Sequence, residues 1–562
     1  MTTTATTAAT TAATTAATTA HVDTFARDRL PPRDAWPAFA FNADTDYPAR
    51  LNCVAALLDR HVDEGRGDRI AVRHAQGAVT YAELAALVDR IAHGLVGEMG
   101  LVPGNRVLLR GPNNLMMAAS WLAVVKAGMI AVPTMPLLRA KELKQIIDKA
   151  QVSAALCDAR LRDELDATLH VGGDYHCPSL TTVRYFNGEG DDALETVISR
   201  QQDKGPFRAC DTAADDICLI AFTSGTTGQP KGTMHFQRDV LAMCDTFPRH
   251  VLHPTPDDVF CGTPPLAFTF GLGGLLCFPL RIGASTVLAE RLTPETLLAL
   301  IQTHRTTIVF TAPTFYRQMA VLALQFDLSS LRKSVSAGEA LPDATRTAWR
   351  AATGIEMTDG IGGTEMMHIF ISSADAEVRP GAIGRVVPGY EARIVDDDMQ
   401  PVPPGTPGRL AVRGPTGCRY LDDARQHAYV RDGWNLPGDT FVADADGYYF
   451  YQARSDDMII SAGYNIAGPE VEGTLMQHPL VAECGVVGGP DAERGQVVTA
   501  YVVLREGVPA SDETRAALQE HVKRQIAPYK YPRRIEFVAA LPRTETGKLQ
   551  RFRLRQMAEG RA

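Results

Sequence analysis

Residues 223–232 read Thr223-Ser224-Gly225-Thr226-Thr227-Gly228-Gln229-Pro230-Lys231-Gly232 and directly follow the apolar run 217–222. The glycines let the backbone turn N–H groups toward an anion, the hydroxyls add donors, and Lys231 adds a positive charge. The stretch is not a Walker A loop, because Gly232 stands where a Ser or Thr would bind magnesium. It predicts a phosphate-binding loop after a buried strand, and the alternative is an ordinary surface loop.

On both sides of this loop, short apolar runs alternate with amphipathic stretches, which is typical of parallel sheets covered by helices. Thr80-Tyr81-Ala82-Glu83 is a capping box that predicts a helix with Leu84, Leu87, Ile91 and Leu95 on one face. We expect a further helix at 115–126 and strands at 106–109, 130–133, 217–222, 307–311 and 331–337. These elements predict an α/β fold.

Beyond Pro380 the composition changes to short, Gly- and Pro-rich stretches, which predict a smaller β-rich subdomain. After Arg454-Ser455-Asp456-Asp457 a compact α+β unit follows, with strands expected at 497–504 and 534–538 and a helix at 511–526. Its length of about a hundred residues suits an independent domain.

The chain has 562 residues, of which 45% are hydrophobic, and a net charge of −9. This composition predicts several domains with large cores and excludes a collagen, a disulfide-stapled miniprotein and a wholly disordered chain. Both signs of charge are mixed along the chain, so no basic face is available for nucleic acid or an anionic membrane. The stretch 259–280 is uncharged but contains three prolines, which favours a buried strand, loop and helix start over a membrane span.

The ten cysteines form no Cys-x-x-Cys pair, and most lie in apolar runs, which is typical of reduced, buried thiols. Residues 1–20 contain only Met, Thr and Ala. They lack the Arg, Lys and Leu of a signal peptide or presequence, and they cannot bury enough apolar surface to fold. We therefore predict a disordered tail at 1–20 and a cytoplasmic protein.

Other motifs contain residue types suited to nucleotide chemistry. In Asp359-Gly360-Ile361-Gly362-Gly363-Thr364-Glu365-Met366-Met367-His368, a Gly turn precedes a hydroxyl, Thr364, and a hard carboxylate ligand for Mg²⁺, Glu365. Gly438-Asp439-Thr440 places an Asp in a turn that, with Arg454, could bind ribose hydroxyls, and the alternative is a solvated loop with a surface ion pair. Residues 336–342 predict a strand-to-helix turn, and Lys548 on its Gly loop is, taken alone, an ordinary surface lysine.

The order of these motifs resembles that of the adenylate-forming superfamily, which contains acyl- and aryl-CoA synthetases, peptide-synthetase adenylation domains and luciferases. The resemblance rests on TSGTTGQPKG, AGEALP, GGTE, GDT, ARSDDMIISAGYNI and PRTETGK, and it covers nearly the whole chain from residue 46 to residue 555. Within the family the chain looks most like benzoate and 2-aminobenzoate CoA ligases, because of FTFGLG at 268–273, DGIGGTEMMHIF and RDRLPPRDAWPAF.

The resemblance implies a multi-domain α/β fold. Its large N-terminal region, expected at 21–455, would combine two α/β subdomains with a β-barrel-like subdomain. A hinge at Asp456 would join this region to a small, mobile α+β domain at 456–562. ATP, Mg²⁺ and coenzyme A are implied as ligands.

The resemblance also implies roles for single residues. Contacts to the β- and γ-phosphates of ATP map to Thr223, Ser224, Gly225, Thr226, Thr227, Gly228 and Lys231. Adenine-pocket residues map to Gly338, Glu339 and Ala340, with Asp359 at the edge of the base. The remaining nucleotide residues map to Thr364 at the α-phosphate, Glu365 as the magnesium ligand, and Asp439 with Arg454 at the ribose.

The implied reaction has two half-reactions. A carboxylate attacks the α-phosphorus of MgATP and expels pyrophosphate; a thiolate then attacks the acyl-adenylate and releases AMP. Lys548 matches the catalytic lysine of the first half-reaction and would leave by rotation of the C-terminal domain about Asp456. Gly463 and Tyr464 match the tunnel that admits the pantetheine arm of coenzyme A.

The acyl pocket would be formed by Thr269, Phe270, the stretch 310–316, Ile361 and His368, whose flat and aromatic walls suit an aromatic carboxylate. His368 would meet a ring substituent such as an ortho amine, and the alternative is a satisfied core histidine. Two positions depart from the family pattern. Asn465 stands where many relatives carry Arg, and Arg409 replaces the acid of a Gly-Glu-Leu strand.

We therefore expect an aryl-CoA ligase, monomeric or homodimeric, that acts on a small aromatic acid, ATP and coenzyme A, without a nucleic acid or membrane partner. Three alternatives keep the adenylation chemistry: loading of a separate carrier protein, activation of another aryl or a medium-chain acid, and oxidation of the adenylate with O₂. A silent nucleotide-binding scaffold is the alternative from another class, and Lys548, Glu365 and the phosphate loop argue against it.

Overall fold

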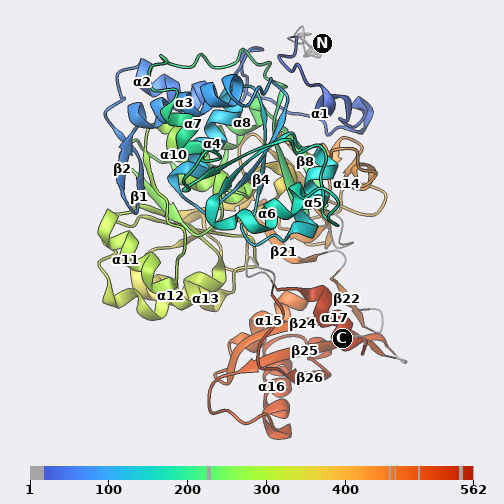
Figure 1. Ribbon diagram of the computed structural model, residues 1–562. Helices are drawn as coiled ribbons and strands as arrows, with labels where there is room; N and C mark the ends of the chain where they lie inside the picture. Colours follow the sequence, from blue (N-terminus) through green and yellow to red (C-terminus); the bar gives the residue numbers. More distant parts are fainter. Residues whose placement is uncertain are drawn as a thin grey trace, which may run out of the picture.

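The protein is described by a computed structural model over residues 18–224, 230–454, 457–461, 464–491, 494–543 and 549–560. Four sheets with their helices organise these ranges (Figure 1). The predicted tail 1–20 lies outside the described residues except for its last three. There the backbone N–H of Ala20 donates to Asp216 Oδ2 over 2.9 Å.

The sheet that carries the phosphate loop has six strands in the order β6-β5-β3-β4-β7-β8. The strands are β3 Arg106–Arg110, β4 Ile130–Thr134, β5 Ala154–Asp158, β6 Thr182–Phe186, β7 Ile217–Ser224 and β8 Pro230–Phe236. The helices of this part are α3 Tyr81–Gly97, α4 Leu115–Lys126, α5 Ala140–Ala150, α6 Arg162–Leu169, α7 Leu194–Ser199 and α8 Gln237–Asp245. All neighbouring strands are parallel except β7 and β8, which form an antiparallel hairpin.

The second sheet has nine strands in the order β15-β14-β13-β12-β11-β9-β10-β1-β2. The strands are β1 Ile70–His74, β2 Gly77–Thr80, β9 Val259–Gly262, β10 Ser285–Val287, β11 Ile308–Thr311, β12 Lys333–Ala337, β13 Met357–Gly362, β14 Ile369–Ser373 and β15 Arg385–Val386. Its helices are α9 Thr269–Leu272, α10 Phe278–Ile282, α11 Pro294–His304, α12 Pro313–Leu322 and α13 Asp343–Thr353, and the short helices α1 Phe25–Asp28 and α2 Arg60–Asp63 precede it. The central strands are parallel, and β2, β14 and β15 add antiparallel edges.

Local sequence explains where the helices begin. Thr80 accepts a hydrogen bond from the Glu83 N–H while Glu83 reaches back, so the predicted capping box is confirmed at the start of α3. Asn114 accepts from the Met117 N–H over 2.9 Å and opens α4, which matches the predicted helix 115–126.

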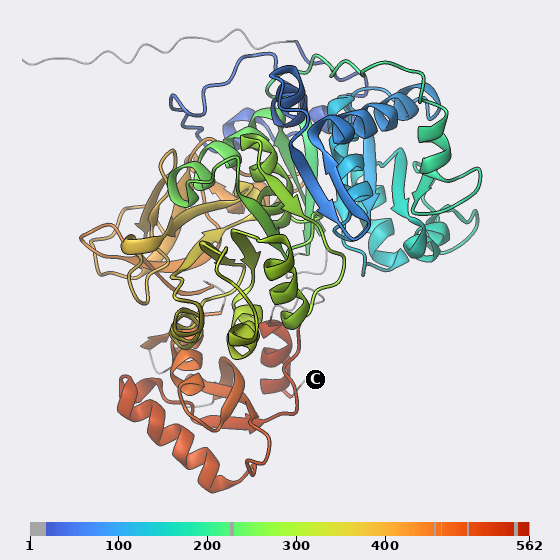
Figure 2. The ribbon, with the colours of Figure 1, turned by 90° about the vertical axis from the view of Figure 1, so that its left-hand side faces the viewer.

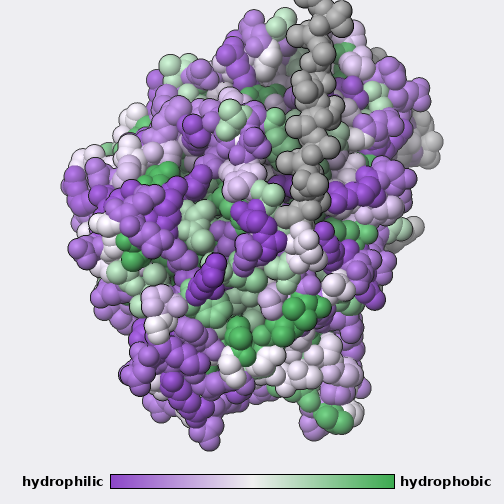
Figure 3. All heavy atoms as spheres, turned by 90° about the horizontal axis from the view of Figure 1, so that it is seen from above, coloured by the Kyte–Doolittle hydropathy of each residue, from purple (hydrophilic) through white to green (hydrophobic). Residues whose placement is uncertain are grey.

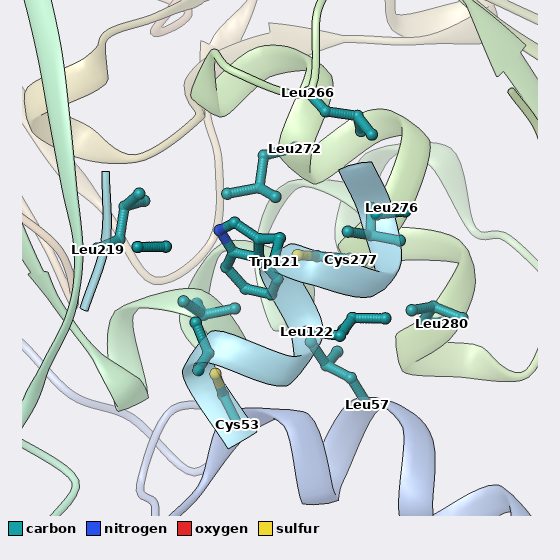
Figure 4. Close-up of a cluster of buried hydrophobic side chains, with 14 of the residues drawn as sticks. Cys53, Leu57, Trp121, Leu122, Leu219, Leu266, Leu272, Leu276, Cys277 and Leu280 are labelled. Carbon is teal, nitrogen blue, oxygen red and sulfur yellow. The ribbon is translucent and has the colours of Figure 1, made fainter. Parts of the chain in front are cut away.

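The two large sheets share one apolar core, and Trp121 of α4 lies at the centre of the part shown in Figure 4. Its indole is 2% exposed. Leu57, Leu219 and Leu272 surround it from segments far apart in the sequence. The core therefore holds the strands and helices of both sheets in one fixed arrangement.

The β-rich part and the C-terminal unit follow in the predicted order. The first contains β16 Glu391–Val395, β17 Gly408–Arg413, α14 Gln426–Tyr429, β18 Val430–Arg431, β19 Trp434–Asn435, β20 Asp439–Ala443 and β21 Tyr449–Arg454. The second contains β22 Ile459–Ser461, β23 Tyr464–Ile466, α15 Gly468–Met476, β24 Val481–Asp491, β25 Gly495–Leu504, α16 Asp512–Gln525, β26 Arg534–Phe537 and α17 Arg551–Ala558. Figure 2 shows the C-terminal unit at one end of the molecule, beside the helices of the nine-stranded sheet.

The stretch 259–280 contains β9, a turn, all of α9 and the start of α10, which agrees with the predicted strand, loop and helix start, and it contains no membrane-length helix. In the described part of the chain, no helix has the length and apolarity needed to cross a bilayer. Polar residues cover most of the face seen in Figure 3, and apolar residues form only small groups there.

Candidate active site

The ends of the predicted phosphate loop meet in the β7–β8 hairpin, where Thr223 lies opposite Lys231. Gly232 is required here, because a Cβ at this position would lie 2.9 Å from the ring of Phe222. Thr223 Oγ1 is buried and has no hydrogen-bond partner among the described residues. Its hydroxyl can therefore donate a hydrogen bond to a phosphate oxygen. Ser224 ends β7, and Gly225, Thr226, Thr227 and Gly228 lie outside the described residues.

Lys231, Glu365 and Tyr420 form a polar cluster beside this hairpin. Lys231 Nζ lies 3.4 Å from Glu365 Oε1 and donates to the Tyr420 hydroxyl over 2.9 Å. That hydroxyl donates to Glu365 Oε1 over 2.6 Å. Burial, and then the neighbouring Glu365, raise the pKa of Tyr420 well above its usual range, so the phenol remains protonated.

The donor set of this cluster fits Mg²⁺ that arrives with a nucleotide. No group of three or more His, Cys, Asp or Glu that could hold a metal occurs within the described ranges. Mg²⁺ is commonly bound by one or two carboxylates together with substrate phosphates and water, and Glu365 supplies one such carboxylate. Glu365 is therefore the residue here that would hold the ion.

Thr364 and Glu365 lie in a single 3₁₀ turn, Thr364–Met366, directly after β13. The sequence predicted a Gly turn before them, but 359–362 belong to β13, because Gly360 allows close packing against Ile369 of β14: a Cβ there would lie 2.8 Å from its side chain. His235 Nε2 lies 2.8 Å from the Thr364 carbonyl oxygen and donates to it. This bond fixes the turn relative to β8.

The predicted adenine wall lies in the turn between β12 and α13, as the sequence indicated. Gly338 has a positive φ of 90°, and Glu339 accepts from Thr314 Oγ1 over 2.8 Å. Ala340 follows in the same turn before α13.

Asp359 lies beside this wall, opposite Ser336 of β12. Its side chain is buried, and its Oδ1 has no partner in the part of the chain that the structure describes. Burial raises the pKa of Asp359 to about 7, so its carboxyl can donate or accept a hydrogen bond near neutral pH.

The predicted ribose pair is joined directly. Asp439 and Arg454 face each other in the β20–β21 pair, with Arg454 Nη1 3.4 Å from Asp439 Oδ1. Arg454 Nη1 also donates to the Pro437 carbonyl over 2.9 Å. Asp439 is the first residue of β20 and not part of a turn as the sequence predicted; the turn is made by Gly438, with φ 84°.

Aromatic side chains surround His368 in the predicted acyl pocket. Its ring lies 5.5 Å from that of Phe270 and 6.4 Å from that of Phe310. Phe278 at 4.6 Å and Phe247 at 5.6 Å complete the aromatic surroundings. Phe247 and Phe278 could not be predicted from the sequence, because apolar positions in core helices have no feature that marks a pocket.

Burial lowers the pKa of His368 to about 3, so the imidazole is neutral. Its Nε2 lies 3.4 Å from the Phe270 carbonyl oxygen, which can only accept, so this nitrogen has the proton. Nδ1 is then an acceptor, and it is buried without a partner among the described residues. The other predicted pocket residues lie close by, Thr269 in α9 and Ile361 in β13.

The predicted hinge, coenzyme A tunnel and catalytic lysine are described only in part. Asp456, Gly463 and Lys548 lie outside the described residues, while Tyr464 begins β23, paired with Ser461. Arg543 and Leu549, on either side of 544–548, form an antiparallel bridge.

Ion pairs join the C-terminal unit to the adenine wall. Glu483 of β24 accepts from Arg317 of α12 over 2.8 Å and from Arg543 over 3.1 Å. Arg543 Nη1 in turn lies 3.8 Å from Glu339 Oε1. Although burial opposes ionisation, the two arginines lower the pKa of Glu483, so the carboxylate stays charged. The segment that leads to Lys548 is thus tied to the predicted nucleotide pocket.

Known proteins are similar to this chain in sequence and in fold. The benzoate–CoA ligase of Thauera aromatica is 35% identical over 515 residues, which cover 90% of this chain and 96% of that protein. The crystal structure of the anthranilate CoA ligase AuaEII in complex with anthranoyl-AMP superposes with a TM-score of 0.86 at 34% identity, covering 92% of this chain and 99% of that one. A benzoate CoA ligase from Burkholderia xenovorans superposes with a TM-score of 0.80 at 32% identity, covering 90% and 100%.

Two family models also match the sequence. The model of the AMP-binding enzyme matches residues 58–419, and that of the AMP-binding enzyme C-terminal domain matches residues 470–548. The first contains the hairpin, the adenine wall, Lys231 and Glu365, and the second contains Glu483 and Arg543. The chain belongs to the family of AMP-binding, adenylate-forming enzymes.

Proposed function

We propose that the protein is an ATP-dependent aryl-CoA ligase. It activates an aromatic carboxylate of the benzoate or 2-aminobenzoate type as acyl-AMP with release of pyrophosphate, and then transfers the acyl group to coenzyme A with release of AMP. The observation that carries this proposal is the aromatic cluster around His368, three residues after Glu365 of the polar cluster. The ring of an aromatic acid and the phosphates of ATP would thus meet at one short segment.

Charge neutralisation is the main task of the first half-reaction, because carboxylate and ATP are both anions. Lys231 and Thr223 would bind the β- and γ-phosphates, and Thr364 would contact the α-phosphate. When bound at Glu365, Mg²⁺ would neutralise phosphate charge as pyrophosphate leaves. Asp359 would bind the edge of the adenine, Asp439 and Arg454 the ribose, and Lys548 would approach the α-phosphate from the C-terminal unit.

The pocket favours 2-aminobenzoate within this substrate class. The neutral His368 presents Nδ1 as an acceptor, and an ortho amino group is a donor of matching chemistry. An ortho amino group would pair Nδ1, which is otherwise buried and unpaired, whereas benzoate would leave it so; the difference is about 1–3 kcal/mol, or roughly tenfold or more in specificity. The neighbouring structure with anthranoyl-AMP supports the same choice.

The test is a panel of benzoate, 2-aminobenzoate, hydroxybenzoates, cinnamates and medium-chain fatty acids, scored by AMP formation that depends on coenzyme A. We expect the aromatic acids to react and 2-aminobenzoate to have the highest kcat/KM. His368→Phe keeps the ring but removes Nδ1, so it should retain benzoate activity and lose the preference. A preference for aliphatic acids, or an unchanged selectivity in His368→Phe, would contradict the proposal.

We also propose a reducing, cytoplasmic location. All ten cysteines are free thiols, and nine of them are buried. Buried thiols without disulfides are typical of proteins that work where glutathione keeps thiols reduced.

A further inference from the structure

Tyr420 reaches the phosphate site from the β-rich part of the chain. The segment 419–421 lies antiparallel to β8, with Tyr420 opposite Thr233. The Met234 N–H donates to the Arg419 carbonyl over 2.8 Å, and the Leu421 N–H donates to the Gly232 carbonyl over 2.8 Å. The phenol is therefore positioned by backbone bonds to the strand that begins at Pro230 and includes Lys231.

The neighbouring residue anchors this segment from the other side. Arg419 is completely buried and forms an ion pair with the equally buried Asp239 at the start of α8. Its guanidinium lies 3.9 Å from the centre of the Phe236 ring, and its Nε donates to the Met234 carbonyl over 3.3 Å. The buried charge pair and these extra contacts fix the position of the segment 419–421. Tyr420 therefore does not depend on its own hydroxyl for its placement.

The hydroxyl makes two bonds with different consequences. Its single proton goes to Glu365 Oε1, and its lone pair accepts from Lys231. The Lys231 ammonium has three N–H protons, so it can donate to the phenol oxygen and still donate to a phosphate. Glu365 Oε1 is occupied by the phenol, which leaves Oε2 for a cation, since no described residue donates to Oε2.

We propose that Tyr420 is a positioning residue for Mg²⁺-bound ATP: its hydroxyl orients the Glu365 carboxylate so that Oε2 faces the metal, and it holds Lys231 beside the same site. This inference rests on the proposed ATP-dependent function. Groups that orient a metal ligand typically change metal affinity by 10–100-fold when they are removed. We therefore expect the loss of the Tyr420 hydroxyl to lower the affinity for Mg²⁺ and to leave the affinity for coenzyme A unchanged.

The test compares binding of α,β-methylene-ATP, whose methylene bridge prevents transfer of the adenylyl group, in excess Mg²⁺ and in EDTA by isothermal titration calorimetry. In the wild type Mg²⁺ should tighten binding, and in Tyr420→Phe this gain should shrink by roughly 10–100-fold. Thioester formation from supplied acyl-AMP, which needs no triphosphate, should stay within about twofold of the wild type.

Tyr81→Phe is the matched control. Tyr81 is also completely buried, and its hydroxyl donates to the Ala284 carbonyl over 2.6 Å in the core. This variant should keep the full Mg²⁺ gain, and unfolding temperatures of both variants would show that both are folded. An unchanged gain in Tyr420→Phe, or an equal loss in both variants, would overturn the proposal. Because the readout is nucleotide binding, it stays valid even if no tested acid is activated and the proposed ligase function fails.

Discussion

His368 should make the stability of the N-terminal region depend on pH. Burial lowers its pKa to about 3 in the folded chain, whereas an unfolded histidine titrates near 6.5. Between these values the unfolded state binds the extra proton, so the free energy of unfolding falls as the pH falls below 6.5. At pH 5 the difference is about 1.5 pKa units at 1.36 kcal/mol each, or roughly 2 kcal/mol relative to pH 8.

The measurement is urea unfolding at pH 8 and pH 5 for the wild type and His368→Gln. Gln cannot titrate and can still donate to the Phe270 carbonyl. All four Trp residues, Trp36, Trp121, Trp349 and Trp434, precede residue 455, so Trp fluorescence follows the N-terminal region alone.

Other buried histidines with lowered pKa, such as His21 and His61, contribute equally to both proteins and cancel in the comparison. The wild type should lose roughly 2 kcal/mol more than the variant between pH 8 and pH 5. Parallel losses in the two proteins would refute the buried, neutral state of His368.

Three further predictions concern the two half-reactions and the pocket. Lys548→Ala should abolish adenylation, measured by ATP–pyrophosphate exchange, while thioester formation from supplied acyl-AMP persists; equal loss of both would exclude its assigned role. Glu483→Gln should weaken the partly exposed pairs to Arg317 and Arg543 and lower adenylation by roughly twofold to fivefold without lowering thioester formation, and an effect on both steps would show a general loss of folding. Gly274→Val should lower kcat/KM for benzoate by at least about tenfold, because even a Cβ there would lie 2.8 Å from the Phe310 ring of the acyl pocket; normal benzoate kinetics would mean that the pocket lies elsewhere.

Sequence patterns predicted the regular elements because their signals are local. The capping box at Thr80, the helix 115–126 and the turn after β12 each depend on residues a few positions apart, and the structure confirms them. The hairpin partner β8 was not predicted, because Pro230 and Gly232 argue against a strand and only packing against β7 makes one.

Contacts of the candidate site could be predicted where both residues belong to the sequence motifs. Lys231 with Glu365 and Asp439 with Arg454 come together as the motif order implied. Tyr420, Phe247 and Phe278 could not be found in this way. Each is an ordinary aromatic residue in the sequence, and its role arises only when segments far apart in the chain meet in the folded core.

The pairing of the segment 419–421 with β8 has a consequence for synthesis of the chain. The two sides of this contact are 185 residues apart, as in the bond from Arg419 to Met234. At about 5–20 residues per second, a ribosome needs roughly 10–40 s to make the intervening chain. During that time the Lys231 strand lacks this neighbour and exposes a free edge, which is a template for wrong pairing. Nascent chains halted before residue 419 should therefore bind chaperones more strongly than chains halted after the whole β-rich part has left the ribosome.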